Sequence, residues 1–203
     1  MTLAGTSNSY SGGTTIAAGT LVAQQASALG SGQVAVSAGA TLEIDGVALS
    51  TGGLTLNGSG VGGAGALQGR NTASHTGAVS LGTASAIGAA TSTDTLTLNN
   101  PVTGLGLTKV GSGVVNLSGS NSYTGGTTIQ AGTLGLSAGA ALPTLGAVTL
   151  AGTGVLNLNN ASQSIGTLSG TSGTRIELGS GSLTVTQGAA GSFAGLVEGS
   201  GNL

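Results

Sequence analysis

Few side chains in this sequence could do chemistry. The chain of 203 residues contains one histidine, His75, five carboxylates and no cysteine. Glu43 and Asp45 lie two positions apart, and along a strand this spacing falls in the range that separates the two carboxylates of a glycosidase. We expect no aromatic platform and no basic partner beside them, so we do not predict a glycosidase.

The remaining ionisable residues also favour structural interpretations. Arg175 and Glu177 flank Ile176, which places both on the outer face of one strand and predicts a surface ion pair of little energetic weight. His75 follows Arg70 in a stretch rich in Ser, Thr and Gly, and we interpret it as a solvated loop residue rather than a metal ligand or general base. The segment 60–90 around it has the weakest hydrophobic alternation. It is our first candidate for a protruding, partner-binding loop, with a less regular coil as the alternative.

The composition excludes whole classes of function. Charged residues make up 4% of the chain and aromatic residues 1%, whereas roughly a quarter of an average protein is charged. Three cations cannot neutralise a track of phosphates, so we expect no nucleic-acid binding. No apolar run approaches the roughly 20 residues that span a bilayer. We therefore predict no catalytic residues, no cofactor, no metal and no membrane insertion by this segment.

A short alternation of apolar and small or polar residues identifies the elements that must position these side chains. It is typical of half-buried strands, and Gly-containing corners separate the runs. Examples are Val34–Val36, Leu54–Leu56, Leu96–Leu98, Leu156–Leu158 and Leu183–Val185. In this pattern Leu134 and Leu156 point inward. Asn157 points outward, where a change to Asp should be nearly silent.

The apolar positions also recur over a longer period of roughly 20 residues. The series runs through Leu96, Val115, Leu134, Leu156, Ile176 and Leu196 at nearly equal intervals. We extend this ladder backward through Leu81, Val61, Leu42, Leu21 and Leu3. Such a period without helical segments predicts a right-handed single-stranded parallel β-helix, a β-solenoid of about ten coils of roughly 20 residues.

The sequence also contains a repeat with a much longer period than one coil. Residues 8–21 (NSYSGGTTIAAGTL) and 121–134 (NSYTGGTTIQAGTL) match at 12 of 14 positions, although they lie in different halves of the chain. We expect a single continuous β-helix segment over 1–203 with at least two related units, about 1–106 and 107–203. Tyr10 and Tyr123 precede a Gly pair in each copy. We interpret each ring as a plug over a corner whose hydroxyl reaches a backbone group; an interaction or secretion motif is the alternative.

The stretch 107–134, LTKVGSGVVNLSGSNSYTGGTTIQAGTL, resembles the autotransporter-associated β-strand repeat, also called the passenger-associated transport repeat. The first copy begins at Thr2 and lacks the K-x-G-x-G lead-in. Across the two copies, the resemblance marks as structural Asn8, Tyr10, Gly12, Gly13, Thr14, Thr15, Lys109, Gly111, Gly113, Asn121, Tyr123, Gly125, Gly126, Thr127 and Thr128.

The resemblance implies a stalk or spacer segment of a type V-secreted bacterial passenger, either secreted or held at the cell surface by a translocator outside this chain. Such a segment would be excised from a longer passenger and would support adhesion. In this family the repeat is tied to secretion and folding rather than to catalysis. Two alternatives remain: a self-associating, filament-forming solenoid whose open ends stack, and a glycan-binding module. The expected partners are a second copy or flanking coils, or a host-cell or glycan surface.

Overall fold

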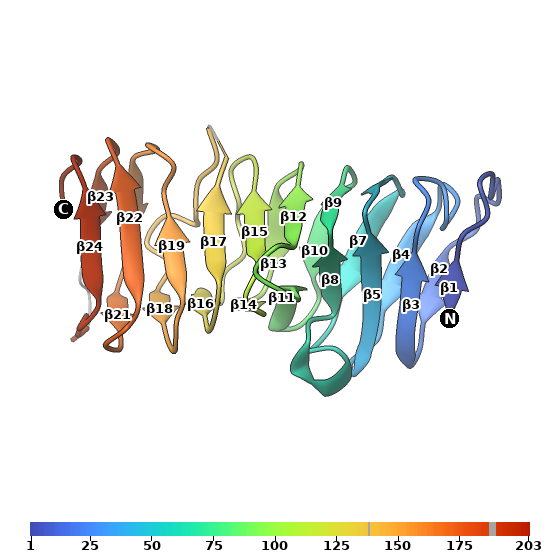
Figure 1. The fold of residues 1–203 in the computed structure, drawn as a ribbon, viewed down its shortest axis with the longest axis horizontal. Coiled ribbons are helices and arrows are strands. Elements are labelled where there is room, and N and C mark those ends of the chain that lie inside the picture. Colours follow the sequence, from blue (N-terminus) through green and yellow to red (C-terminus); the bar gives the residue numbers. More distant parts are fainter. Residues whose placement is uncertain (138, 187–189) are drawn as a thin grey trace.

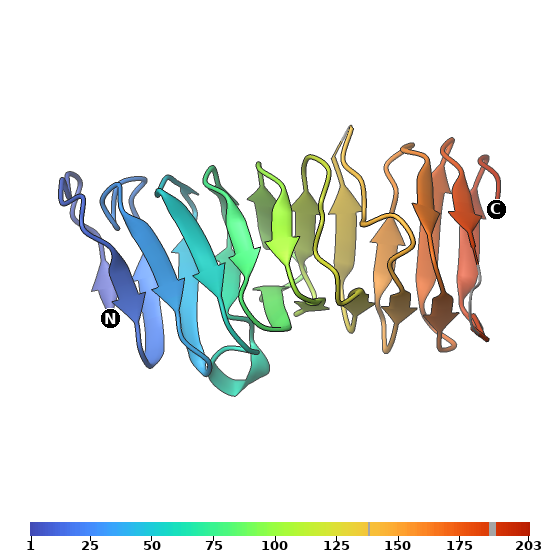
Figure 2. The ribbon, with the colours of Figure 1, turned by 180° about the vertical axis from the view of Figure 1, so that it is seen from behind.

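The chain winds as a parallel β-helix, with its two ends at opposite ends of a rod (Figure 1). This computed structural model describes residues 1–137, 139–186 and 190–203. Within those ranges the secondary structure consists of short strands, β1 to β24, and one 3-10 turn, η1 (Val61–Gly63), with no α-helix. Seen from behind, the coils continue from one end to the other (Figure 2). The predicted fold class is confirmed.

Three sheets form the walls of the rod, and every strand pair in them is parallel. Sheet A pairs β1 (Thr2–Leu3), β3 (Gly19–Ala23), β5 (Ala40–Asp45), β8 (Leu67–Arg70), β11 (Ser85–Ala89), β14 (Leu107–Val110), β16 (Thr127–Ile129), β18 (Val148–Leu150) and β21 (Leu168–Gly170). Sheet C pairs β6 (Ala48–Leu49), β9 (Thr72–His75), β12 (Thr95–Leu98), β15 (Val114–Leu117), β17 (Thr133–Leu136), β19 (Val155–Asn157), β22 (Arg175–Gly179) and β24 (Leu196–Gly199).

The third wall is less regular. Sheet B pairs β2 (Thr14–Ile16), β4 (Gln33–Val36), β7 (Gly53–Leu56), β10 (Val79–Leu81) and β13 (Val102–Gly104). Farther along the rod, β20 (Gln163–Ile165) and β23 (Leu183–Val185) form a separate two-stranded sheet. A complete coil passes from sheet A to sheet C to sheet B, as β8, β9 and β10 do before β11 returns the chain to sheet A.

The length of each coil can be followed along the inner face of sheet A. The register passes through Leu21, Leu42, Leu67, Ile87, Lys109, Ile129, Leu150 and Gly170. The interval stays near one coil of about 20 residues, except that the step from Leu42 to Leu67 is longer. That long step contains η1, which projects from the rod (Figure 1). The rest of the segment 60–90 forms regular strands β8 to β11, so the protrusion is confined to its start.

The apolar ladder is partly as expected. Leu96, Val115, Leu134, Leu156 and Ile176 stand in register on sheet C and all are buried. The final rung is wrong, because Val197 rather than Leu196 lies opposite Ile176. The backward extension is also wrong. Leu81 belongs to sheet B, Val61 is exposed in η1, and Leu42, Leu21 and Leu3 lie on sheet A. Every coil carries several apolar rungs, so the coil period by itself does not specify the wall.

The two copies of the repeat lie on different walls. The sequence Thr-Thr-Ile forms β2 of sheet B in the first copy and β16 of sheet A in the second. Leu21, at the end of the first copy, lies on sheet A, in the row of paired residues that continues from coil to coil as far as Ile129. Its counterpart in the second copy, Leu134, lies on sheet C. The second copy is therefore rotated about the rod axis by one wall relative to the first.

Candidate functional site

The repeat motif places one tyrosine inside the rod and its counterpart near the surface. Tyr123 is 1% exposed and its Oη lies 2.7 Å from Thr127 Oγ1. Tyr10 makes the same contact with Thr14 Oγ1 at 2.9 Å but is 42% exposed. In both copies the hydroxyl reaches a threonine side chain four residues later. This corrects the expectation of a backbone partner.

The matched tyrosines give a first prediction. Tyr123→Phe should lower the free energy of unfolding by about 1 kcal/mol, because a buried threonine hydroxyl loses its partner. Tyr10→Phe should change it by less than about 0.5 kcal/mol, since water can replace the phenol at an exposed site. Urea unfolding followed by far-UV circular dichroism measures both. Equal losses would show that burial does not decide the weight of this contact.

The motif asparagine links successive coils. Asn121 Oδ1 accepts from the Val102 N–H at 2.8 Å, and Asn121 Nδ2 donates to Gly119 O at 3.2 Å and to Ala141 O at 2.8 Å. Asn8 makes the equivalent forward contact, to Ala28 O at 2.8 Å. The motif asparagine therefore serves the same purpose in both copies, which is to join its own coil to the next one.

Lys109 is completely buried, although the sequence marks it only as a motif position. It lies on sheet A in register with Ile87 and Ile129. Its Nζ donates to Val110 O at 2.9 Å, Gly111 O at 2.7 Å and Ala131 O at 3.0 Å. Burial lowers the pKa of Lys109 to about 8. The ammonium thus holds together carbonyls of two neighbouring coils at a corner.

The other motif positions shape the corners. Gly111 and Gly126 have φ of 75° and 79°, and a Cβ on Gly111 would lie 2.2 Å from Ala89 O. Gly113 is buried, and its carbonyl accepts from the Thr133 N–H at 3.1 Å. The remaining positions lie at or near the surface: Gly12, Gly13, Thr15 and Gly125 are exposed and Thr128 is half-buried.

His75 is not the solvated loop residue that the sequence suggested. It is fully buried on β9, in register with Leu49 and Leu98. Its Nε2 lies 3.0 Å from Thr51 Oγ1, and its Nδ1 has no hydrogen-bond partner among the described residues. The alternation in Thr-Ala-Ser-His, with Ala73 also inward, was the signal that could have placed it in a strand.

Burial of His75 predicts acid lability. It lowers the pKa of His75 from 6.5 to about 4, more than a contact with the Gly77 backbone raises it. The unfolded chain therefore binds the proton more readily, and about 3 kcal/mol of stability should be lost as the pH falls from about 6.5 to about 4. His75→Leu should remove that part of the pH dependence in urea unfolding. An unchanged profile in the variant would contradict the assignment.

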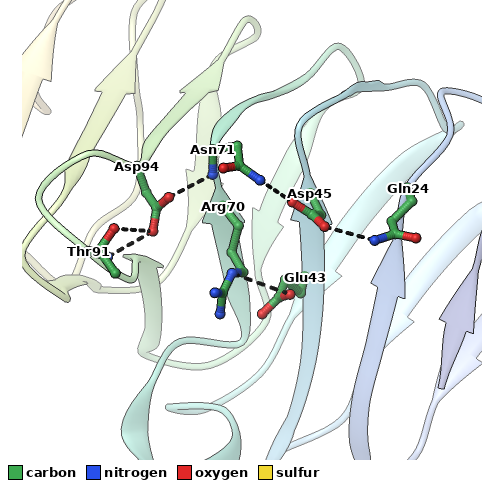
Figure 3. Close-up of polar contacts among 7 residues, drawn as sticks. All are labelled: Gln24, Glu43, Asp45, Arg70, Asn71, Thr91 and Asp94. Atoms are coloured by element: carbon green, nitrogen blue, oxygen red, sulfur yellow. Dashed lines mark hydrogen bonds and ion pairs between the residues drawn. The ribbon is translucent and has the colours of Figure 1, made fainter.

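The acidic residues Glu43 and Asp45 lie on β5 and Asp94 lies directly before β12, and they are not an open site (Figure 3). Arg70 Nε lies 3.9 Å from Glu43 Oε1, which corrects the expectation that no basic partner is near. Burial raises the pKa of Glu43, and Arg70 offsets only part of this. Asp45 accepts from Gln24 Nε2 at 2.9 Å and from Asn71 Nδ2 at 2.6 Å.

Asp94 extends this series of polar contacts to the next coil. One of its oxygens accepts from the Asn71 N–H at 2.7 Å, and the other accepts from the Thr91 N–H and Oγ1 at 2.8 and 2.9 Å (Figure 3). Burial would raise the pKa of Asp94, but these hydrogen bonds and Arg70 together lower it. Each carboxylate oxygen of Asp45 and Asp94 is therefore engaged, and the contacts through Asn71 stitch neighbouring coils together.

On β22 lies the surface ion pair that the sequence suggested. Arg175 Nη1 lies 3.8 Å from Glu177 Oε1 and 3.8 Å from Glu198 Oε2. Asn157 donates to Glu177 Oε2 at 2.6 Å, so Asn157→Asp would set two carboxylates side by side. The expectation that this change is silent is therefore corrected.

The part of the chain that the structure describes holds no metal-binding cluster and no spanning helix. Nowhere in it do three or more His, Cys, Asp or Glu side chains gather in a way that could hold a metal ion. None of its helical segments is long and apolar enough to cross a membrane.

Comparison with known families finds a match at the two motif copies. A family model described as passenger-associated-transport-repeat matches residues 1–23 and 107–136, which contain these copies. The chain is a β-solenoid in which two stretches match this repeat, and the predicted resemblance to autotransporter passengers is confirmed.

A curated relative with a known name matches part of the chain. The chain is 37% identical over 132 residues to the "Adhesin BmaC autotransporter" of Brucella suis biovar 1 (strain 1330). The match covers 63% of this chain and 3% of the length of that relative. No solved structure matches the chain.

Proposed function

We propose that this segment is a rigid spacer of a secreted or cell-surface passenger, and that it holds an adhesive region away from the cell that makes it. The observation that carries the proposal is the unbroken pairing of nine strands in sheet A, from β1 to β21. At about 4.8 Å per strand this gives a rod of roughly 40 Å. The similarity to an autotransporter adhesin supports placing the rod in such a passenger.

The engaged side chains support a structural role over catalysis. The carboxylates of Asp45 and Asp94 are held by neighbouring donors, and Lys109 is held by three carbonyls. His75 is closed off from solvent. A catalytic acid or base needs to reach a substrate proton, and these groups are committed to the fold instead.

The spacer proposal is tested in a parent passenger displayed on cells. One variant replaces this segment with a Gly/Ser linker of equal residue number, and a control replaces it with an unrelated β-solenoid of equal rod length. We expect the linker to make the height of the passenger tip variable in electron micrographs and to weaken adhesion, because a flexible chain of this length has an r.m.s. end-to-end distance of roughly 80 Å and does not hold a fixed distance. The solenoid control should retain a uniform tip height and adhesion. Full adhesion and a uniform tip height with the linker would refute the spacer role.

A second candidate function is end-to-end self-association. The N-terminal end of the rod has a largely apolar pocket of about 530 Å³ that includes Leu3, Tyr10, Ile16 and Leu21. Tyr10 is exposed, whereas Tyr123 in the second copy is buried. Since all strands run parallel, the C-terminal coil of a second copy would meet this end head to tail and generate an open filament.

Electron microscopy and light scattering over a concentration series test the second candidate. Filaments with an axial repeat of roughly 40 to 50 Å would support stacking, and Tyr10→Lys, which places a charge at the exposed end face, should abolish them. Ala35→Lys on a side wall is the matched control. Isolated short rods at every concentration would contradict self-association.

A further inference from the structure

The outer face of sheet C carries a row of polar side chains that a glycine interrupts. The positions stand in register from coil to coil: Ser74, Thr97, Asn116, Gly135, Asn157, Glu177 and Glu198. Because strands lie about 4.8 Å apart, this row runs along the rod axis. Gly135 contributes no side chain to this row, and the Asn116 side chain lies over it.

A pocket of about 330 Å³ lies at this interruption. Its lining combines apolar groups with a polar rim and consists of Val114, Asn116, Thr133, Gly135, Leu136, Asn157, Asn159 and Glu177. A Cβ on Gly135 would lie 2.3 Å from Asn116 Oδ1, so the glycine gives the Asn116 carboxamide its place over the strand. The shape of the hollow therefore depends on glycine at position 135.

The polar rim has both fixed and free hydrogen-bonding groups. Asn157 Nδ2 donates to Glu177 Oε2 at 2.6 Å, and Asn157 Oδ1 accepts from the Asn159 N–H at 2.8 Å. These contacts hold one side of the rim in place. The carboxamides of Asn116 and Asn159 make no hydrogen bond to another described residue, so their donors and acceptors face solvent.

We propose that this hollow binds a neutral oligosaccharide. Free carboxamides and the Glu177 carboxylate offer donors and acceptors to sugar hydroxyls, while the half-buried Val114 can contact the C–H face of a pyranose ring. The polar row continues on both sides of the hollow, which suits an extended sugar chain lying along the rod. This binding role does not depend on the spacer function.

The charges around the hollow select against other ligands. Glu177 and Glu198 lie side by side, and Arg175 contacts both carboxylates, which leaves an acidic surface that repels acidic sugars. Glu177 is the one carboxylate among the residues that line the pocket. A divalent cation usually needs more anionic ligands than this.

The test is a titration of the ¹⁵N-labelled chain with cellobiose, N,N′-diacetylchitobiose and lactose, followed by NMR. We expect at least one sugar to shift amide signals of β15, β17 and β19 with millimolar or tighter affinity. Asn116→Ala should weaken that sugar about tenfold. Gly135→Val should abolish binding, because its side chain displaces the Asn116 carboxamide and narrows the hollow, at a position where valine suits a strand.

Thr149→Val, on the outer face of sheet A, is the matched control and should bind like the wild type. The amide spectrum of each variant shows directly whether the rod is intact. No shift with any of the three sugars would overturn the proposal. So would shifts that Gly135→Val leaves unchanged.

Discussion

Leu156→Asp is expected to unfold the coils around it, with a loss of about 4 kcal/mol or more in the free energy of unfolding. Leu156 is fully buried and stands between Leu134 and Ile176 on the inner face of sheet C. A carboxylate there would face apolar side chains from its own coil and both neighbouring coils. An unpaired buried charge is among the most destabilising substitutions known.

The measurement combines urea unfolding with hydrogen exchange, because a solenoid can lose a few coils while the rest stay folded. We expect exchange protection to disappear first in β17, β19 and β22. The control is Thr149→Asp, at an exposed position of β18 between Thr128 and Ser169. It should cost less than about 1 kcal/mol. Equal losses in the two variants would show that the assignment of inner and outer faces is wrong.

The period and composition were enough to predict the solenoid, whereas assigning residues to walls required the structure. Leu96 to Ile176 could be aligned because their steps match one coil. Leu81 and Leu42 lie about two periods apart, but the step from Leu81 to Leu96 is shorter than one coil, and the two residues lie on sheets B and A. Each coil has two or three short strands with similar apolar pairs. The sequence therefore shows the length of the repeat but not which wall each strand belongs to. The longer coil around η1, from Leu42 to Leu67, then shifts any count that passes through it.

The two copies of the motif show the same limit in another form. Twelve of fourteen residues agree, yet Leu21 lies on sheet A and Leu134 on sheet C. Each copy needs neighbouring coils at its corner rather than a particular wall. Asn121 and Asn8 accordingly make the same forward contact after this rotation. The motif therefore specifies how its coil stacks on the neighbouring coils. The number of residues between the two copies determines which wall each copy lies on.

Buried polar residues were the hardest to predict. His75 and Lys109 are residue types that usually lie at the surface. The sequence does not show which carbonyl groups accept hydrogen bonds from Lys109 or that the hydroxyl of Thr51 contacts His75. Both lie at inward strand positions that a strict alternation of residues would have identified. Arg70 and Glu43 became neighbours only through the pairing of β5 with β8, which brings successive coils together.

Lys109→Met should lower the free energy of unfolding at pH 7 by about 3 kcal/mol. Methionine can fill the space of the lysine stem, but Val110 O, Gly111 O and Ala131 O would lose the donor that joins them. Each buried acceptor left without a partner costs about 1 to 3 kcal/mol, and removal of the buried charge offsets part of that. Ile129→Met, the next inward position in the same row, is the matched control and should cost less than about 1.5 kcal/mol.

The pH dependence separates the charge of Lys109 from its hydrogen bonds. The pKa of Lys109 is about 8 in the folded chain, below the ordinary 10.5 of the unfolded chain, because burial disfavours the ammonium. Between these values the unfolded chain binds more protons, so stability should rise with pH, by about 2 kcal/mol from pH 7 to pH 9.5. The neutral amine still has hydrogens to donate to the carbonyls. Urea unfolding at the two pH values should show this rise in the wild type and in Ile129→Met, and no such rise in Lys109→Met. A rise that persists without Lys109 would assign it to another group, and equal stability of the two methionine variants at pH 7 would show that the three carbonyls do not need the ammonium.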